Sequence, residues 1–174
     1  MKRRNIVSCI AALMMIASLC LAQAVSQKNK AAVSAPTSGG GHHVVTPDKI
    51  EWTHPPFMPA GAALAVIDGD PSKSGGLYTI RIKAIDGLKV PPHWHPEDEH
   101  ITVLKGNFMI ATGEKYDQAA LHAMLVGTYC VMPKEMRHFG FTKGETIVQV
   151  HGVGPFKVNY VNPADDPQNK TSSK

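Results

Sequence analysis

Short runs rich in Val, Ile and aromatic residues recur between positions 52 and 161, and turn-forming segments separate them. The runs are AALAVI (62–67), LYTIRIKAI (77–85), HITVL (100–104), FMIAT (108–112), GTYCVMP (127–133), ETIVQVHGV (145–153) and FKVNYV (156–161). The intervening DGDPSKSGG, DGLKVPP, KGN and GEK segments are rich in Gly, Pro, Asn, Asp and Ser, which favour turns. Seven short strands at this spacing predict an all-β sandwich or barrel.

One segment inside this region and two outside it depart from the strand pattern. Residues 117–124 read as one or two helical turns, with Asp117 as the capping residue. The stretch before position 49 is rich in Ser, Ala, Gly, Lys and Pro, and the end of the chain is polar, so neither has a hydrophobic period. We therefore expect a flexible linker (25–48), one β-barrel domain (49–163) and a disordered tail (164–174).

The first 24 residues have the layout of a secretory signal peptide. Three basic residues at positions 2–4 precede an apolar stretch, Ile10–Leu21, and Ala22-x-Ala24 supplies a cleavage signal. The apolar stretch contains Ser18 and is shorter than the ~20 residues that a membrane-spanning helix needs. We predict a signal peptide over 1–24, a periplasmic or secreted protein, and no stable membrane anchor after cleavage.

Cleavage changes the charge and the cysteine content. Cys9 and Cys20 leave with the signal, so Cys130 has no partner for an intramolecular disulfide. The 18 Lys and Arg residues fall to 15, against 14 Asp and Glu, which gives a net charge of +1. No cluster of basic residues remains, and we therefore expect no nucleic-acid partner.

Two histidines and a glutamate lie within the seven positions from 93 to 99. Side chains two apart on an extended strand share a face, so His93 and His95 point the same way while Trp94 points to the other side. Glu99 keeps this parity. Two imidazoles and a carboxylate suit iron, manganese, nickel, copper or zinc. The pattern predicts a site for one divalent transition metal, without identifying which.

The segment from Gly87 to Gly106 resembles the first sequence motif of the cupin family, Gly-x5-His-x-His-x3-Glu-x6-Gly, with every spacing met. The family spacing favours Glu99 over the nearby Glu97 as the carboxylate ligand. This resemblance implies a single cupin, jelly-roll-like β-barrel with a metal inside it.

A second cupin motif, Gly-x5-Pro-x-Gly-x2-His-x3-Asn, is matched in part downstream. Gly127, Pro133 and His138 occupy their expected positions, whereas Glu135 stands in place of the glycine and Thr142 in place of the asparagine. These departures leave the geometry of the local turn open. Together the two motifs imply four metal ligands: His93, His95, Glu99 and His138.

Three histidines and one glutamate leave one or two positions of a five- or six-coordinate metal open, as in catalytic metal sites. Cupins with this ligand set are similar to non-haem dioxygenases, isomerases, oxalate-degrading enzymes and small hydrolases. The resemblance therefore implies a metal-dependent enzyme, oxygenase-like or isomerase-like, that acts on a small organic substrate. The alternative is a non-catalytic cupin that binds or senses a small molecule or a metal. The sequence also leaves a homodimer open.

For several other polar residues, the sequence pattern does not show which side of the barrel they face. Gln149 and His151 share one face of the last long strand, with valines on the other face. The sequence leaves open whether these two residues, Tyr78 and Arg81 line the cavity. Cys130 lies within the apolar run TYCVM, and we expect it to be a buried, inert thiol.

Overall fold

A computed structural model describes residues 42–170. The predicted signal peptide and most of the predicted linker fall outside these residues, as do positions 171–174. The described residues all belong to one compact unit. No helix in residues 42–170 is long and apolar enough to span a bilayer.

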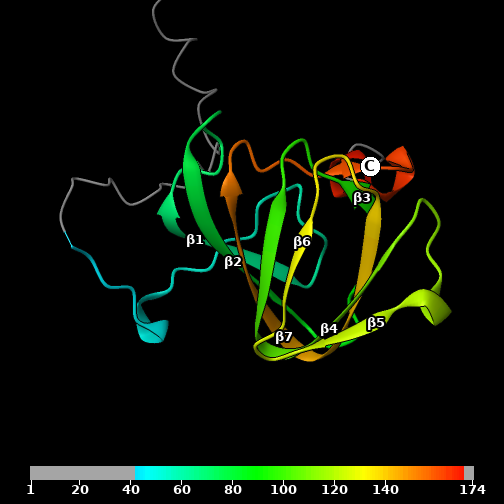
Figure 1. The fold of residues 1–174 in the computed structure, drawn as a ribbon, viewed down its shortest axis with the longest axis horizontal. Helices are drawn as coiled ribbons and strands as arrows, with labels where there is room; N and C mark the ends of the chain where they lie inside the picture. The colour runs from blue at the N-terminus through cyan, green and yellow to red at the C-terminus, as the bar shows by residue number, and fades with distance from the viewer. Residues whose placement is uncertain (1–41, 171–174) are drawn as a thin grey trace, which may run out of the picture. The chain divides into compact units, whose positions relative to one another are not determined.

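The described residues form a β-barrel, which confirms the predicted fold class (Figure 1). Its strands are β1 (Ala62–Gly69), β2 (Leu77–Ala84), β3 (Lys89–Trp94), β4 (Glu99–Thr112), β5 (His122–Leu125), β6 (Tyr129–Met132), β7 (His138–Val153) and β8 (Asn159–Tyr160). The helical pieces are the 3₁₀ turns η1 (Pro47–Lys49), η2 (Gln118–Ala120) and η3 (Pro163–Asp165), and one short α-helix, α1 (Pro167–Lys170).

The two longest strands, β4 and β7, form the spine of the barrel. They pair antiparallel from His100 opposite His151 to Thr112 opposite His138. The second half of β7 also pairs with β2, and its first half pairs with β3. Because β7 contacts different neighbours along its length, the eight-stranded sheet curls and closes around a core, as the strands in Figure 1 show.

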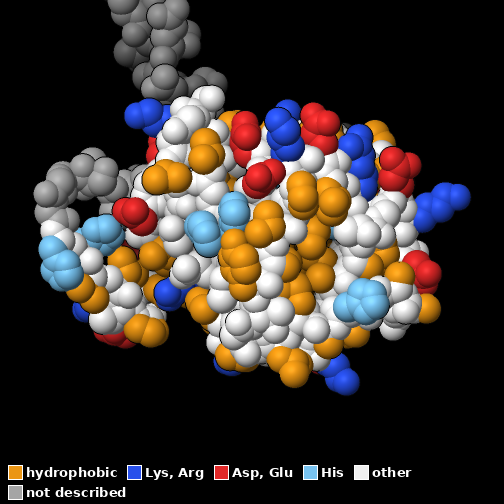
Figure 2. All heavy atoms as spheres, viewed as in Figure 1, with side chains coloured by type: hydrophobic (Ala, Val, Ile, Leu, Met, Phe, Trp, Pro, Cys, Tyr) orange, Lys and Arg blue, Asp and Glu red, His pale blue; other side chains and the backbone are white. Residues whose placement is uncertain are grey.

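Alternate residues of the strands fill the interior, as a period of two requires. Tyr78 and Ile80 of β2 and Val148 and Val150 of β7 are all buried in the main core, together with Leu64, Ile101, Val103, Ile110 and Met124. A smaller cluster of Ala111, Leu121 and Phe139 extends this core. On the face shown in Figure 2, hydrophobic side chains gather near the middle, and Lys, Arg, Asp and Glu side chains lie around the upper edge.

The helical prediction for residues 117–124 is correct only in its first turn. The Asp117 side chain accepts a hydrogen bond from the Ala119 backbone N–H at 2.9 Å and begins η2. From His122 the chain is instead strand β5, which pairs with β4 between residues 107 and 110. Hydrogen bonding to a neighbouring strand outweighs the weak local helical pattern here.

The runs HITVL and FMIAT, predicted as two strands around a KGN turn, are one continuous strand, β4. The register of β4 against β7 shifts between Val103 and Lys105 and again between Lys105 and Asn107. Gly106 lies at this irregularity with φ 75°, and a Cβ there would lie 2.5 Å from the Glu145 carbonyl oxygen. The segment therefore bends the strand without reversing it.

The predicted disordered tail is partly ordered, because the described part contains η3 and α1 as far as Lys170. The Asn162 side chain accepts a hydrogen bond from the Ala164 N–H at 3.1 Å, and the Asn169 side chain donates to the Pro163 carbonyl at 2.8 Å. These local side-chain hydrogen bonds satisfy backbone groups and support the short helical turns. The polar composition of the segment alone does not reveal such bonds.

Candidate metal centre

The four predicted ligands come from three strands and one turn, and the structure brings them together. His93 lies near the end of β3 and pairs across the sheet with His138, the first residue of β7. His95 follows one residue after β3, and Glu99 is the first residue of β4. Glu99 does not continue the strand of His93, contrary to the prediction from shared parity, because the chain turns between β3 and β4. The start of β4, and not a continuous strand, directs the carboxylate inward.

The side chains of these four residues are buried and their polar atoms converge. One ligand atom from each of His93, His95 and His138 lies within 4.8 Å of the others, a grouping that could hold a metal ion. Oε2 of Glu99 lies 3.4 Å from Nε2 of His95 and 3.4 Å from Nε2 of His138. None of the four is more than 7% exposed.

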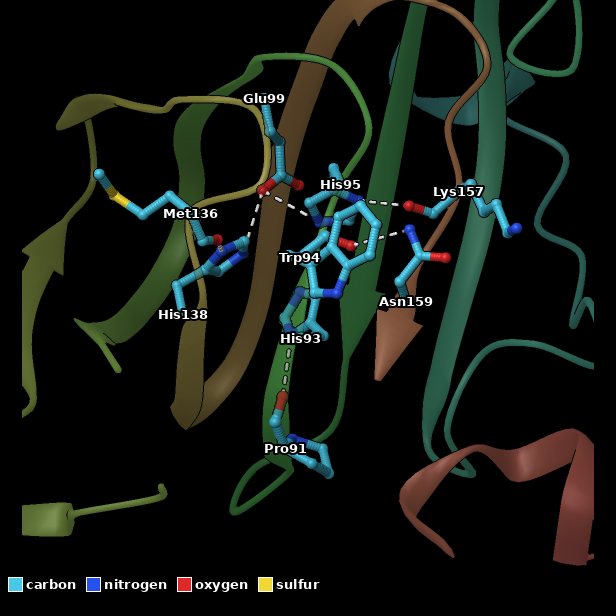
Figure 3. A network of polar contacts seen from close by, with 9 residues as sticks. All are labelled: Pro91, His93, Trp94, His95, Glu99, Met136, His138, Lys157 and Asn159. Atoms are coloured by element: carbon cyan, nitrogen blue, oxygen red, sulfur yellow. Dashed lines mark hydrogen bonds and ion pairs between the residues drawn. The ribbon is translucent and has the colours of Figure 1, made fainter. Parts of the chain in front are cut away.

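Each histidine is held by a backbone carbonyl through its Nδ1 atom (Figure 3). A carbonyl oxygen only accepts hydrogen bonds, so Nδ1 must carry the proton. In the neutral ring this leaves Nε2 with a free lone pair, the tautomer that a metal ligand needs. The bonds join His93 to Pro91 at 2.8 Å, His95 to Lys157 at 2.8 Å and His138 to Met136 at 3.0 Å.

The charges in the site depend on this close packing. Burial alone would raise the pKa of Glu99, but the surrounding histidines lower it to about 2. Burial, with the neighbouring imidazoles, lowers the pKa of His93 to about 3. Burial would lower the pKa of His138 too, but its contact with Glu99 raises it above the usual value. At neutral pH Glu99 is an anion, and the site favours a positive charge beside it.

The donor set fits a divalent transition metal. Nε2 of His95 and Oε2 of Glu99 are buried and have no hydrogen-bond partner in the described part of the chain. With Nδ1 protonated, both atoms present lone pairs to each other, which costs free energy unless a cation lies between them. Three imidazole nitrogens and one carboxylate oxygen suit zinc, copper, nickel, iron or manganese.

The turn that carries the second motif keeps a glycine-like geometry although its residue is glutamate. Glu135 has φ 62°, in the left-handed region that glycine adopts without penalty. Its backbone N–H donates to the His95 carbonyl at 2.8 Å. Replacement of glycine by Glu135 therefore leaves the turn in place, and the turn links the His95 backbone to the start of β7.

Thr142, which replaces the motif's asparagine, fastens the turn before β3. It is 2% exposed, and its Oγ1 accepts from the Leu88 N–H at 2.8 Å and donates to the Ile85 carbonyl at 2.7 Å. Backbone bonds from Gly87 N–H to the Thr142 carbonyl and from Thr142 N–H to the Leu88 carbonyl add to these. Thr142 therefore supports the barrel and leaves no polar atom unpaired.

A cavity of about 90 Å³ lies beside the four candidate ligands. Apolar side chains from several strands make most of its wall, including Ala84, Val90, Phe108 and Val148. Apart from the ligands, its one ionisable lining residue in the described part of the chain is Tyr160. Burial, with nearby acidic groups, raises the pKa of Tyr160 to about 12. Sequence reasoning missed this residue, although its strand-like run FKVNYV was recognised.

The structure separates the four residues whose position the sequence left open. Tyr78 points inward, where it is buried in the main core and packs against Phe156 with ring centroids 5.9 Å apart. Gln149 and His151 lie on the opposite side of β7 from the cavity-lining Val148 and Val150.

The outer side of the sheet carries its own polar contacts. Gln149 accepts a hydrogen bond from Nε of Arg81 at 3.1 Å. His151 is exposed, and its ring stacks on His100 with centroids 4.9 Å apart. These residues therefore lie away from the four candidate ligands.

Cys130 is half-buried and packs against the main core. Burial, with the charge of Glu99, raises the pKa of its thiol to about 11. The thiol therefore stays protonated at neutral pH, although the side chain is half-buried and not fully buried as expected.

The fold and the family are both recognised by comparison with known proteins. Among solved structures, the polyketide cyclase RemF from Streptomyces resistomycificus is similar to this chain, with a TM-score of 0.57 and 18% sequence identity. The similarity covers 76% of this chain and 94% of the RemF chain. An acetylacetone dioxygenase from Acinetobacter johnsonii is similar with a TM-score of 0.55 and 14% identity, covering 76% and 85%. At these identities the likeness concerns the fold alone.

None of the curated proteins compared with this chain matches it. A family model described as the ChrR Cupin-like domain does match, over residues 41–157. The match covers more than half of the chain and includes both motifs and all four converging side chains. The chain therefore belongs to the ChrR cupin-like family of the cupin superfamily.

Proposed function

We propose that this protein is a metal-dependent enzyme with oxygenase-like or isomerase-like chemistry on a small organic substrate. The observation that supports this most is the set of three buried imidazoles with Nδ1 fixed on carbonyls, beside a cavity, with Nε2 of His95 and of His138 each 3.4 Å from the Glu99 carboxylate. Such an arrangement suits a metal that keeps an open position toward a ligand.

His93, His95, Glu99 and His138 would hold one divalent ion of iron, manganese, nickel, copper or zinc. When bound, a metal of this kind supplies Lewis-acid chemistry and, if redox-active, electrons to a substrate or dioxygen. The protein contributes the fixed tautomers of the three histidines, one negative charge, and walls that exclude water from the reacting group.

Tyr160 is the residue of the cavity wall that could handle a proton. Its raised pKa keeps the phenol protonated at neutral pH, so it acts as a hydrogen-bond donor. Tyr160 lines the cavity beside the four candidate ligands, and its ring lies 6.1 Å from that of His93 between centroids, so a hydrogen bond from its hydroxyl to a bound ligand is part of the proposal. In an enzyme, this donation would stabilise negative charge that develops on the substrate.

A second candidate is a cupin that binds or senses a small molecule without turnover. The apolar character of the wall favours it, since an enzyme ordinarily places several acidic, basic or positioning groups around its open coordination site. Both candidates share the metal centre and a small-molecule partner. They differ in turnover: only in the enzyme would Tyr160 stabilise charge that develops on a reacting substrate.

Turnover assays on the full chain, loaded with each of the five metals, distinguish these functions. Phenols, thiols, ketones and carboxylates would be screened, with dioxygen uptake followed for the ferrous form. The proposal expects product from one combination, and a lower rate in Tyr160→Phe at unchanged metal content. Saturable binding without product in every metal form would contradict the enzyme and support the binding protein.

We further propose that the protein is exported and that its signal is removed after Ala24. The basic start, the Ile10–Leu21 apolar stretch and Ala22-x-Ala24 support this. N-terminal sequencing of protein recovered from the periplasm or medium should begin near Val25. Recovery of the chain in the cytoplasm, still beginning at Met1, would contradict export.

A further inference from the structure

The cavity beside the four candidate ligands has walls whose chemistry differs from that of the ligands. No Lys, Arg or Asp is present among the residues of the described chain that line it. Two threonines contribute hydroxyls, but Thr142 Oγ1 and Thr146 Oγ1 both bond to backbone carbonyls. The remaining wall apart from the four candidate ligands is aliphatic or aromatic, with Tyr160 as its one other residue that carries a hydroxyl.

From the lining of this cavity we infer the class of small molecule that it binds. The inference rests on the proposed metal centre. The cavity binds a small molecule with one oxygen-bearing head group, such as a carboxylate or an enolate, and an uncharged apolar body. The head group meets the metal centre and the body lies against aliphatic side chains. Sugars and dicarboxylates are excluded, because their additional hydroxyls or second charge would lose hydration without gaining partners.

The size of the cavity limits the body of the ligand to a few carbon atoms. Its volume of about 90 Å³ is well below the ~300–1,000 Å³ of pockets that hold drug-sized ligands. Ala62 of β1 and Ala84 of β2 are opposite each other in register and both line the cavity. Because both residues are alanine, their small side chains leave the cavity open between β1, β2 and the four candidate metal ligands.

The charge of the site supports a single anionic head. Glu99 is buried and a coordinating carboxylate carries one negative charge, whereas imidazoles are neutral when they coordinate. A divalent ion therefore leaves one net positive charge, which one carboxylate neutralises. A second carboxylate would lie among apolar side chains with no cation to pair with it.

The test uses the full chain loaded with Co²⁺, which reports ligand binding through its visible absorption spectrum. Acetate, propionate and butanoate are titrated, with affinities measured by calorimetry. Succinate serves as the matched probe, because it has the carbon count of butanoate and one more charge. Burial of methylene groups should tighten binding roughly fourfold for each added carbon. Succinate should bind at least tenfold more weakly than butanoate.

Two variants change the size of the cavity in opposite directions. Ala84→Val narrows it and should weaken butanoate binding more than acetate binding. Ile82→Ala, also on the lining, widens it and should extend the favourable chain length toward pentanoate. The two variants are independent of each other, so one that fails to fold still leaves the other informative. Thr102→Val, on the outer side of β4, is the control and should leave the series unchanged.

The possible outcomes separate the ligand class from the metal centre. Affinity that rises with chain length and falls for succinate supports the inference. If acetate binds but chain length has no effect, or if succinate binds as tightly as butanoate, the ligand class is wrong while the metal centre stands. If the loaded protein binds no carboxylate at all, both the ligand class and the open metal site are contradicted.

Discussion

Nε2 of His95 lies 3.4 Å from Oε2 of Glu99, and neither buried atom has a hydrogen-bond partner in the described chain. The Nδ1 proton of His95 is already committed to the Lys157 carbonyl. The pair therefore needs a cation, either a metal or a proton. A proton would go most readily to His138, whose pKa Glu99 raises, and the following predictions distinguish these two occupants.

Replacement of Glu99 by glutamine should weaken metal binding by more than it weakens folding. The amide keeps the shape but removes the anion that balances the metal charge. Removing a partner of a metal ligand commonly costs ~10–100-fold in affinity, and loss of the carboxylate should cost at least as much. Glu97→Gln, at an exposed neighbouring position, is the matched control and should bind metal normally. Equal affinity in both variants would contradict a role for Glu99 as a ligand.

Metal affinity should fall as the pH falls. A histidine must be neutral to coordinate, and the raised pKa of His138 means that a proton occupies its Nε2 first. Below that pKa, the dissociation constant should rise about tenfold per pH unit for one competing proton. The low pKa values of His93, about 3, and Glu99, about 2, add further losses only in strong acid.

Titration with Zn²⁺ at pH 8, 7, 6 and 5 measures this effect. His151→Ala is the control, because that exposed residue lies outside the barrel and its removal should leave the profile unchanged. A dissociation constant that is the same at pH 8 and pH 5 would be inconsistent with a three-histidine site.

Glu135→Gly should keep or increase stability, by up to about 1 kcal/mol in the free energy of unfolding. Glycine adopts the left-handed conformation without the ~1–2 kcal/mol cost paid by other residues, although it also loses more freedom on folding. Glu135→Val should destabilise, because a β-branched side chain tolerates this conformation poorly. Lys134→Gly is the control and should lose stability. Urea unfolding checks all three, and a gain from valine would contradict the strained turn.

Thr142→Val should lower the free energy of unfolding by about 1–3 kcal/mol. The valine preserves the shape but leaves the Leu88 N–H and the Ile85 carbonyl without their side-chain partner. Thr102→Val, on the outer side of the sheet, should change stability by less than ~0.5 kcal/mol. Equal stability of the two variants would show that the threonine hydroxyl is not what fastens the turn before β3.

The fold class followed from the sequence because alternation in short runs reports directly on half-buried strands. Alternation does not report how strands end or join, however. The segment around Gly106 contains turn-forming residues, and only the pairing of β4 with β7 makes it an irregularity within one strand. Residues 122–125 form a strand for the same reason, since they pair with β4.

The candidate ligands could be proposed from their spacing, yet the reason that brings Glu99 inward was visible only in the structure. Periodicity gives two faces of a strand and does not say which faces the interior. Gln149 and His151 illustrate this, because the curl of the barrel places them outside and Val148 inside. Tyr160 was missed because a single aromatic residue in a short strand resembles an ordinary core residue.

The metal content of the purified full chain tests the central claim most directly. Elemental analysis of native protein should give about one divalent transition metal per chain. His138→Ala should lose most of it, since removal of one ligand opens the coordination shell, while His151→Ala should retain it. A folded native protein that neither contains nor binds metal, or a His138→Ala variant that keeps full occupancy, would contradict the four-residue metal centre.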